Sequence, residues 1–313
     1  MRDVVRLWLS RLGMMLAAGL LIVGLAWLPA GVVRPEGDDL PAEALWGVRT
    51  EPMQRFILKP PSVPAGRPRA YWSFSQYRGA VLTYLRQLAT GQVTDAAARA
   101  LVSLRLLSQA LGLGMAAGAV LGLLSLRRGV LRGASLCVTV AGLAVPDFLA
   151  VVLLQMLTIF TYREFGVRLY SVLGPAGEER GWLLPLLALS IGPMAYTARL
   201  VVTALDEEMR EHYIRTARAK GLPEVLVVAK HGMRNAVGRV LGGLPGMMGI
   251  ALSSLVVIEV LGNVNGLGAT LLWTSSYAAV ATAGLIFCVW IGLVDGLANT
   301  LRIVANPRVR EGA

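Results

Sequence analysis

The stretch from Leu106 to Leu126, LLSQALGLGMAAGAVLGLLSL, contains 21 residues and no charge, and an arginine stands on each side of it. About 20 predominantly apolar residues are enough for an α-helix to cross the hydrocarbon core of a bilayer. Gly114, Gly118 and Gly122 recur at every fourth position, which allows another helix to approach the backbone closely. We therefore expect a membrane-spanning helix that packs through its glycines against a helix of this chain or of a partner subunit.

Five other long stretches carry at most one charge each: 12–33, 133–162, 181–198, 240–258 and about 278–301. The third span along the chain is expected within 133–162, where Asp147 is the single interruption. Composition agrees, because 55% of the 313 residues are hydrophobic and only 16% are charged, whereas soluble domains carry about 25% charged residues. The sequence predicts an all-α membrane protein with six transmembrane helices and argues against a soluble enzyme.

A secretory signal peptide is the alternative interpretation of the first stretch. Its apolar run is longer than the usual core of a signal, and Leu28-Pro29-Ala30-Gly31 is a poor cleavage site, so we expect an uncleaved first span within 1–33. Residues 34–99 then form a large external loop, with seven prolines before residue 71 and a helical apolar pattern over 73–92 that predicts a short surface helix. Residues 100–313 form a five-helix core with a cytoplasmic loop at 205–235.

Basic residues exceed acidic ones, 30 against 19, which gives a net charge of +11. They collect in four short segments: the N-terminus, the second and fourth connections between spans, and the C-terminus. Short loops rich in arginine and lysine mark the cytoplasmic side, so we expect both termini in the cytoplasm and 34–99 outside. A nucleic-acid-binding protein would gather its positive charge in one patch, and no nucleic-acid partner is expected.

Motifs for nucleotide, metal or acyl chemistry are missing from the sequence. No Gly-Lys pair occurs anywhere, so the chain lacks the lysine with which a P-loop reaches phosphates. His212 and His231 lie 19 residues apart outside any HExxH pattern, and there is no nucleophile elbow. We expect no catalytic residue, no metal site and no nucleotide bound by this chain.

The connection at 204–236, ALDEEMREHYIRTARAKGLPEVLVVAKHGMRNA, contains the most informative pattern. Four apolar residues at intervals of four predict one amphipathic helix: Leu205, Met209, Tyr213 and Ala217. The acids at 206–208 would lie in its first turn, where the helix dipole favours negative charge.

A glycine and a proline divide this connection into the two arms of an elbow. Gly221 suits the C′ position after the first helix, and Pro223 suits the first position of a second helix. The second arm has an apolar stripe of its own: Leu222, Leu226, Ala229 and Met233. Such an elbow is consistent with a solvated loop, a hairpin on the membrane surface or a docking element for a cytoplasmic partner.

The run YIRTARAKGL, from Tyr213 to Leu222, closely resembles the cytoplasmic coupling loop of bacterial ABC-importer permeases of the dipeptide/oligopeptide/nickel type. His231 and Arg234-Asn235-Ala236 follow it as they do in that family. The resemblance assigns eight residues to the ATPase-coupling loop: Tyr213, Arg215, Thr216, Ala217, Ala219, Lys220, Gly221 and Leu222.

The resemblance covers roughly 72–310, because further runs match in order. Glu259 with Gly266-Leu267-Gly268 resembles the family's Glu…Pro-Gly-Leu-Gly stretch. The segment that contains Asp295 resembles the family's last span. We take four residues as pore or gating candidates: Asp147, Glu259, Gly266 and Gly268. Asp147 either faces the pore or makes a hydrogen bond in helix packing, and Glu259 should lie near the outer mouth.

Asp295 is a different case, because it should lie nearer the cytoplasmic end of its span. There it is within reach of Arg199 or Arg302, and we expect an ion pair with one of them. The sequence also departs from the family pattern at several points. Gly262, Asn265 and Asn306 replace the usual Phe, Pro and Asp, and the family's Pro near Arg239 is missing.

The resemblance implies a type I ABC-importer permease fold and a place in a larger assembly. Two homologous permease subunits would enclose the translocation path in the lipid bilayer of a bacterial or archaeal inner membrane. Two cytoplasmic ATPase subunits would carry ATP and magnesium and receive the elbow in a groove, and an extracytoplasmic solute-binding protein would deliver the solute. The expected solute is a di- or oligopeptide, with nickel or another small solute as the alternative.

Two other functions compete with this one. A secondary transporter or channel without an ATPase would need an inverted repeat or several intramembrane charges, and the sequence has neither. A membrane scaffold is the non-transport alternative. Co-purification with an ATPase distinguishes the three functions.

Overall fold

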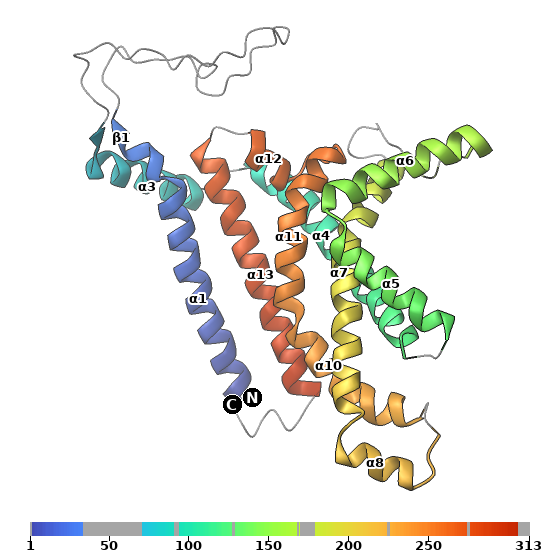
Figure 1. Cartoon of the computed structure of the whole chain (residues 1–313). Coiled ribbons are helices and arrows are strands. Elements are labelled where there is room, and N and C mark those ends of the chain that lie inside the picture. The colour runs from blue at the N-terminus through green and yellow to red at the C-terminus, as the bar shows by residue number, and fades with distance from the viewer. Residues whose placement is uncertain are drawn as a thin grey trace. The chain divides into compact units, whose positions relative to one another are not determined.

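The computed structural model describes residues 2–33, 71–90, 94–126, 129–167, 169, 179–223, 226–273 and 276–305 (Figure 1). The chain divides into two compact units. The shorter unit is Val23–Gln92, and the longer unit combines Met1–Ile22 with Val93–Ala313. The longer unit contains all the candidate residues named above.

Among the described residues, six helices are long and apolar enough to cross a membrane, which confirms the predicted number of spans. They are α1 (Arg2–Ala26), α4 (Thr94–Leu124), α6 (Asp147–Phe165), α7 (Glu179–Glu208), α11 (Leu244–Leu261) and α13 (Tyr277–Ala305). A helix satisfies its own backbone hydrogen bonds, which is the requirement for crossing hydrocarbon. α7 continues ten residues beyond the predicted end of the fourth span at residue 198.

The predicted third span is interrupted at Pro146. Instead of one helix over 133–162, the chain forms α5 (Val130–Ala144) and α6, which run in different directions (Figure 1). Proline has no N–H to donate and disfavours a helical conformation in the residue before it. Val145 is accordingly extended, with φ −74° and ψ 121°, and its backbone continues neither α5 nor α6. The predicted third span is therefore divided at Pro146, and of the two helices only α6 is long enough to cross a membrane.

Glycines in α4 let this helix lie directly against α7. A Cβ atom on Gly118 would come within 2.3 Å of the Met194 carbonyl oxygen, and one on Gly122 within 2.7 Å of the Val201 side chain. Both distances are shorter than a van der Waals contact, so only glycine permits this approach. The predicted glycine contact is confirmed, and its partner is a helix of the same chain.

The hydrophobic core of the longer unit lies where α4, α7 and α11 meet. Buried side chains come from all three helices: Leu106, Leu107, Leu184, Leu189, Met247, Met248, Leu255 and Ile258. Interiors of this kind are close-packed and resist deformation. α11 therefore packs along its length against α4 and α7. One of its ends follows α10 and the other carries Glu259.

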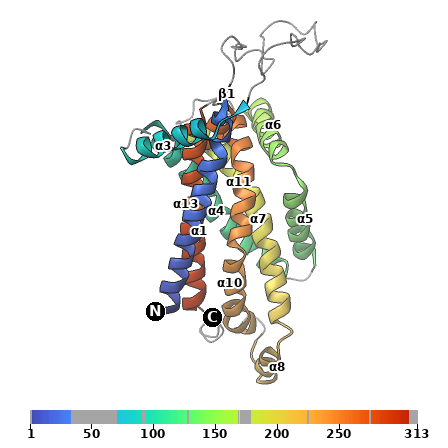
Figure 2. The same ribbon diagram turned by 90° about the vertical axis from the view of Figure 1, so that its left-hand side faces the viewer.

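Short helices occupy the two ends of the longer unit. At one end lie α8 (His212–Ala219), the π-helical segment η2 (Val227–Gly232) and α10 (Met233–Gly242), and Figure 2 shows α8 beyond the end of α7. Towards the other end, α12 (Leu267–Trp273) packs against α11, α13 and α4 (Figure 1).

The shorter unit is built around aromatic side chains. It contains the 3-10 turn η1 (Leu28–Gly31), the antiparallel strands β1 (Val32–Val33) and β2 (Tyr71–Trp72), and α3 (Phe74–Ala89), which lies within the predicted surface helix. Tyr84 is fully buried against Trp27, with ring centroids 5.6 Å apart. The Tyr77 hydroxyl donates to the carbonyl of Gly24 across 3.1 Å. The proline-rich stretch 34–70 lies outside the described residues.

Candidate functional site

The elbow begins where α7 ends, at Glu208, and continues as α8 after a tight turn at 209–211. The last two N–H groups of this turn donate to carbonyls three residues back instead of four. The prediction of one helix from Leu205 to Ala217 is therefore wrong. Positions five apart in one helix point about 140° away from each other, so the break is what allows Tyr213 to face Glu208.

The acids at 206–208 lie in the last turn of α7, not in the first turn of a helix as predicted. No proline or glycine separates them from the fourth span, so that helix runs on through them. The helix dipole is negative at this end and disfavours carboxylates. Because these acids lie at the end of a helix instead of at its start, the helix dipole destabilises their negative charge instead of stabilising it.

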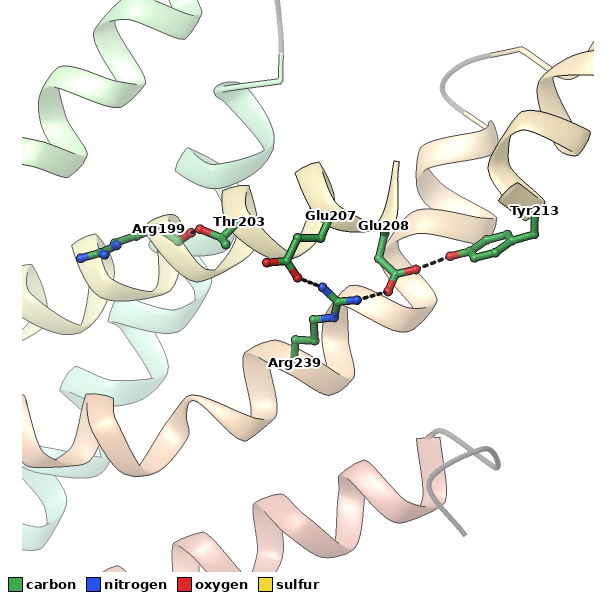
Figure 3. A network of polar contacts seen from close by, with 6 residues as sticks. All are labelled: Arg199, Thr203, Glu207, Glu208, Tyr213 and Arg239. Carbon is green, nitrogen blue, oxygen red and sulfur yellow. Dashed lines mark hydrogen bonds and ion pairs between the residues drawn. The ribbon is translucent and has the colours of Figure 1, made fainter. Parts of the chain in front are cut away.

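Arg239 of α10 supplies the missing positive charge (Figure 3). Its Nη2 atom lies 2.8 Å from Oε1 of Glu208, and its other amino nitrogen pairs with Glu207. The second carboxylate oxygen of Glu208 accepts a hydrogen bond from the Tyr213 hydroxyl. Glu208 is buried, whereas the Glu207 side chain is 58% exposed, so the pair with Glu208 is the less screened of the two.

The apolar residues of the elbow form two clusters instead of one stripe. Leu205 is buried with Val201, Ala204 and Ala236 at the end of the spans. Ile214 and Ala217 of α8 are buried against Val227 of the second arm, so the two arms cover each other. The outward face of α8 is mostly polar. Four exposed residues, three on α8 and one directly after it, are candidate coupling residues: Arg215, Thr216, Ala219 and Lys220.

Gly221 makes the corner of the elbow. Its φ of +76° lies in the left-handed region, which glycine enters without strain. Its N–H donates to the carbonyl of Arg218 across 2.9 Å, and the second arm starts where the carbonyl of Pro223 accepts the N–H groups of Leu226 and Val227. The predicted C′ position of Gly221 is confirmed.

Glu259, near the far end of α11, has no exposed surface. Its Oε1 accepts the Ser103 hydroxyl across 2.5 Å, and its Oε2 accepts the Ala269 N–H across 2.9 Å. The Ser103 oxygen in turn accepts the N–H of Leu267 across 2.7 Å. Hydrogen bonds of this kind are what make a buried carboxylate tolerable, and here they tie α12 to α4 and α11.

The two glycines of the Gly-Leu-Gly run lie against the Glu259 carboxylate. A Cβ atom on Gly266 would be 2.3 Å from Oε1, and one on Gly268 would be 2.9 Å from Oε2 and 3.1 Å from the Val256 Cα. The carboxylate therefore occupies the space that any side chain at these positions would need. The structure brings three of the four pore or gating candidates into one site.

Asp147, the fourth candidate, is the first residue of α6, where the helix dipole favours a carboxylate. Its side chain is partly exposed and makes no hydrogen bond or ion pair with a residue that the structure describes. It is thus separate from the network around Glu259. Its role, in the pore or in packing, stays a prediction.

Asp295 of α13 is buried, and its carboxylate pairs with Arg11 of α1 across 2.5 Å. Both predicted partners, Arg199 and Arg302, are wrong. The cause is the position of α1, which lies beside this part of α13, so that the indole N–H of Trp8 also reaches α13, 3.1 Å from the Thr300 hydroxyl. Spacing along the sequence could not reveal which span is the neighbour.

Within the described ranges no three His, Cys, Asp or Glu side chains gather so as to hold a metal ion. Both carboxylate oxygens of Glu259 are already taken by hydrogen-bond donors. The polar groups of both sites are therefore used to join helices.

Residues 110–310 match a known family, the binding-protein-dependent transport system inner membrane components. The chain belongs to this family. It is 30% identical, over 98% of its own length and the whole of the relative, to the dipeptide transport system permease protein DppB of Lactococcus lactis subsp. cremoris. DppB of Bacillus subtilis is 34% identical over 53% of each chain, and the glutathione transport system permease protein GsiC of Escherichia coli strain K12 is 30% identical over 56% of each.

Family membership confirms the resemblance found in the sequence and the all-α permease fold. The permease is a multi-pass membrane subunit of a binding-protein-dependent importer. The sequence did not predict that three side chains would contact its carboxylates: Ser103, Arg11 and Arg239. Serine and arginine are common beside spans, and only the helix packing shows which of them meet a carboxylate.

Proposed function

We propose that the permease forms half of the translocation path of an ATP-driven importer of di- or oligopeptides, beside a second homologous permease subunit. The observation that carries the peptide class is the match to a dipeptide permease over the whole length of both chains. The glutathione permease among the relatives points to the same class of solute. An extracytoplasmic binding protein delivers the peptide to the mouth of the path.

Two separate cytoplasmic ATPase subunits bind ATP and magnesium and drive transport through the elbow. This part of the proposal is supported by the absence of a P-loop from the sequence and by the polar outward face of α8. The candidate contact residues are Arg215, Thr216, Ala219 and Lys220, with Gly221 holding the corner. Because the two arms cover their own apolar faces, the docking surface is polar instead of the apolar stripe that the sequence suggested.

The elbow and both termini face the cytoplasm in this proposal, and 34–99 lies outside. Basic residues in the short loops beside the spans support this orientation. Glu259, Gly266 and Gly268 then fix α12 near the outer mouth of the path, at the opposite end of α11 from the elbow.

The experiment is cross-linking combined with uptake. In a background with Cys137 and Cys288 replaced by alanine, Thr216→Cys or Ala219→Cys should trap a separate ATPase, and differently with and without ATP. Gln87→Cys, exposed on α3, is the control that should trap none. Vesicles containing the complex, supplied with its binding protein, should take up tritiated dialanine only with ATP. Uptake by the purified chain alone would favour a secondary transporter, and capture without uptake of any peptide would favour another solute.

A further inference from the structure

The last turn of α7 concentrates negative charge where a helix tolerates it least. Residues 206–208 are all acidic, the helix dipole adds a negative end, and Glu208 is only 5% exposed. Such a group is stable only when a positive partner lies close by. That partner, Arg239, comes from another helix and stands 31 residues further along the chain.

The guanidinium of Arg239 contacts both Glu207 and Glu208, and Glu208 also accepts a hydrogen bond from Tyr213 of α8 (Figure 3). Arg239, Glu208 and Tyr213 belong to α10, α7 and α8 respectively. The fork of an arginine can donate to two carboxylates at once, which the single ammonium of a lysine cannot do with the same geometry. One buried carboxylate thus stands at the meeting point of three helices.

The buried apolar contacts of α8 make only part of this connection, because they reach η2, which continues directly into α10. Ile214 and Ala217 are buried against Val227, a residue of the elbow's own second arm. Apolar packing therefore relates α8 to η2 and so to the start of α10, whereas the polar network adds a link through Glu208 that also includes the end of α7. After the short break at Gly243, α10 leads directly into α11, which runs to Glu259.

We propose that Arg239, acting through Glu208, is a positioning residue that fixes α8 relative to α7 and α10, so that movement imposed on α8 reaches α11. The inference rests on the proposed function, in which an ATPase docks on the elbow. It adds a polar link between the elbow and the ends of the spans, beside the chain connections and the apolar packing. Loss of the link would leave an elbow that still docks and moves while the spans no longer follow.

The test reads movement at both ends of this route in the membrane complex, without needing the solute. Environment-sensitive labels are placed on Thr216→Cys of α8 and on Leu261→Cys, which is 41% exposed at the end of α11, in the background without native cysteines. In the otherwise wild-type chain, ATP should change both signals. With Arg239→Met, ATP should still change the α8 signal, while the α11 response should fall to less than about a fifth, as expected when a coupling of several-fold is lost.

Charge exchange separates a positioning role from a general loss of stability. Arg239→Glu combined with Glu208→Arg should restore the α11 response to within about twofold of wild type, because the pair is re-formed and a tyrosine hydroxyl can donate or accept. Arg199→Met is the matched control. Arg199 is an exposed arginine of α7 whose side chain takes no part in the network (Figure 3), and both responses should stay at the wild-type level.

Each outcome decides between the two ideas. If neither label responds to ATP in the wild-type background, the proposed function fails, whatever Arg239 does. If both labels respond normally with Arg239→Met, or if charge exchange leaves the α11 label silent in an assembled complex, the role of Arg239 is refuted. Should Arg239→Met fail to assemble, Tyr213→Phe decides, because it removes only the hydroxyl; an unchanged α11 response would then overturn the proposal and a weakened one would support it.

Discussion

The hydroxyl of Ser103 on α4 lies 2.5 Å from Oε1 of Glu259 on α11, across 156 positions of the sequence. The same hydroxyl oxygen accepts the N–H of Leu267 at the start of α12. One small side chain therefore joins three helices around a carboxylate that has no exposed surface. Because burial of an unpaired carboxylate is strongly unfavourable, the hydrogen bonds decide whether α12 can stay in place.

Replacing Ser103 by alanine should lower the free energy of unfolding by about 1–3 kcal/mol, because a buried carboxylate oxygen and a buried N–H lose their shared partner. Thermal unfolding of the purified permease in detergent measures the change. Ser108→Ala is the matched control, since Ser108 is exposed and bonds only the Leu104 carbonyl of its own helix. Equal shifts for the two variants would show that the network around Glu259 contributes nothing.

Adding a methyl group at Gly266 should displace α12. The new Cβ atom would lie 2.3 Å from Oε1 of Glu259, and neither the carboxylate nor the chain can yield without losing hydrogen bonds. Leu267→Cys, at a position that is 1% exposed, should react with a water-soluble maleimide about tenfold faster when Gly266→Ala is present, because local opening sets access to buried sites.

Gly249→Ala is the control for this experiment. Gly249 lies on α11 as well, but apart from its chain neighbours and the backbone of its own helix, no atom of a described residue lies within 4 Å of a Cβ built there. It should leave the reaction of Leu267→Cys unchanged and stabilise the helix slightly, because alanine favours helix more than glycine does. A protected cysteine in Gly266→Ala would show that α12 has room for a side chain.

The sequence predicts a feature of this fold correctly where the physical cause lies within a single segment. Charge-free stretches predict the spans, because hydrocarbon excludes charge, and a glycine between two arms predicts a left-handed corner, because other residues are strained there. Gly221 and the glycines that admit α7 against α4 belong to this class. Each can be recognised without knowing its neighbours in space.

The parts that sequence reasoning missed depend on packing between distant segments. The charge-free stretch 133–162 predicts one span, although Pro146, which has no N–H, follows the end of α5 there. Leu205 and Ala217 share a spacing of four with the residues between them, yet they belong to different helices, because spacing alone does not show where a helix ends. Arg11 meets Asp295 only because α1 lies against α13, and no pattern within either segment records this.

The ion pair between Arg11 and Asp295 should contribute measurably to stability. Arg11→Met leaves a buried carboxylate without its partner, and because the Arg11 side chain is one-third exposed, we expect a loss of about 1–3 kcal/mol, less than for a fully buried pair. The effect should largely vanish in an Asp295→Asn background, which is the double-mutant test for a direct interaction. Arg6→Met, at an exposed position of the same helix, should change the unfolding temperature little; a change as large as that of Arg11→Met would assign the effect to net charge.

The orientation of the permease can be measured on two cysteine variants that lie outside the described residues. With Cys137 and Cys288 replaced by alanine, Ala65→Cys should react with a membrane-impermeant maleimide on intact cells, and Ala313→Cys should react only after the membrane is opened. The reason is the distribution of arginine among the short loops. The opposite pattern would overturn the topology and with it the assignment of the elbow to the cytoplasm.

Gly221→Val should abolish transport while leaving membrane insertion intact. A β-branched side chain is strained at a φ of +76°, by about 1–3 kcal/mol, so the corner should open and the two arms should separate. The effect is conformational and not a clash, because among the described residues, chain neighbours aside, no atom lies within 4 Å of a Cβ built at this position. Gly221→Asn is the matched control, since asparagine tolerates the left-handed region and should retain at least about half of the uptake. Uptake of tritiated dialanine at matched membrane levels gives the answer: wild-type rates for Gly221→Val, or an equal loss in Gly221→Asn, would show that the corner does not work through its backbone conformation.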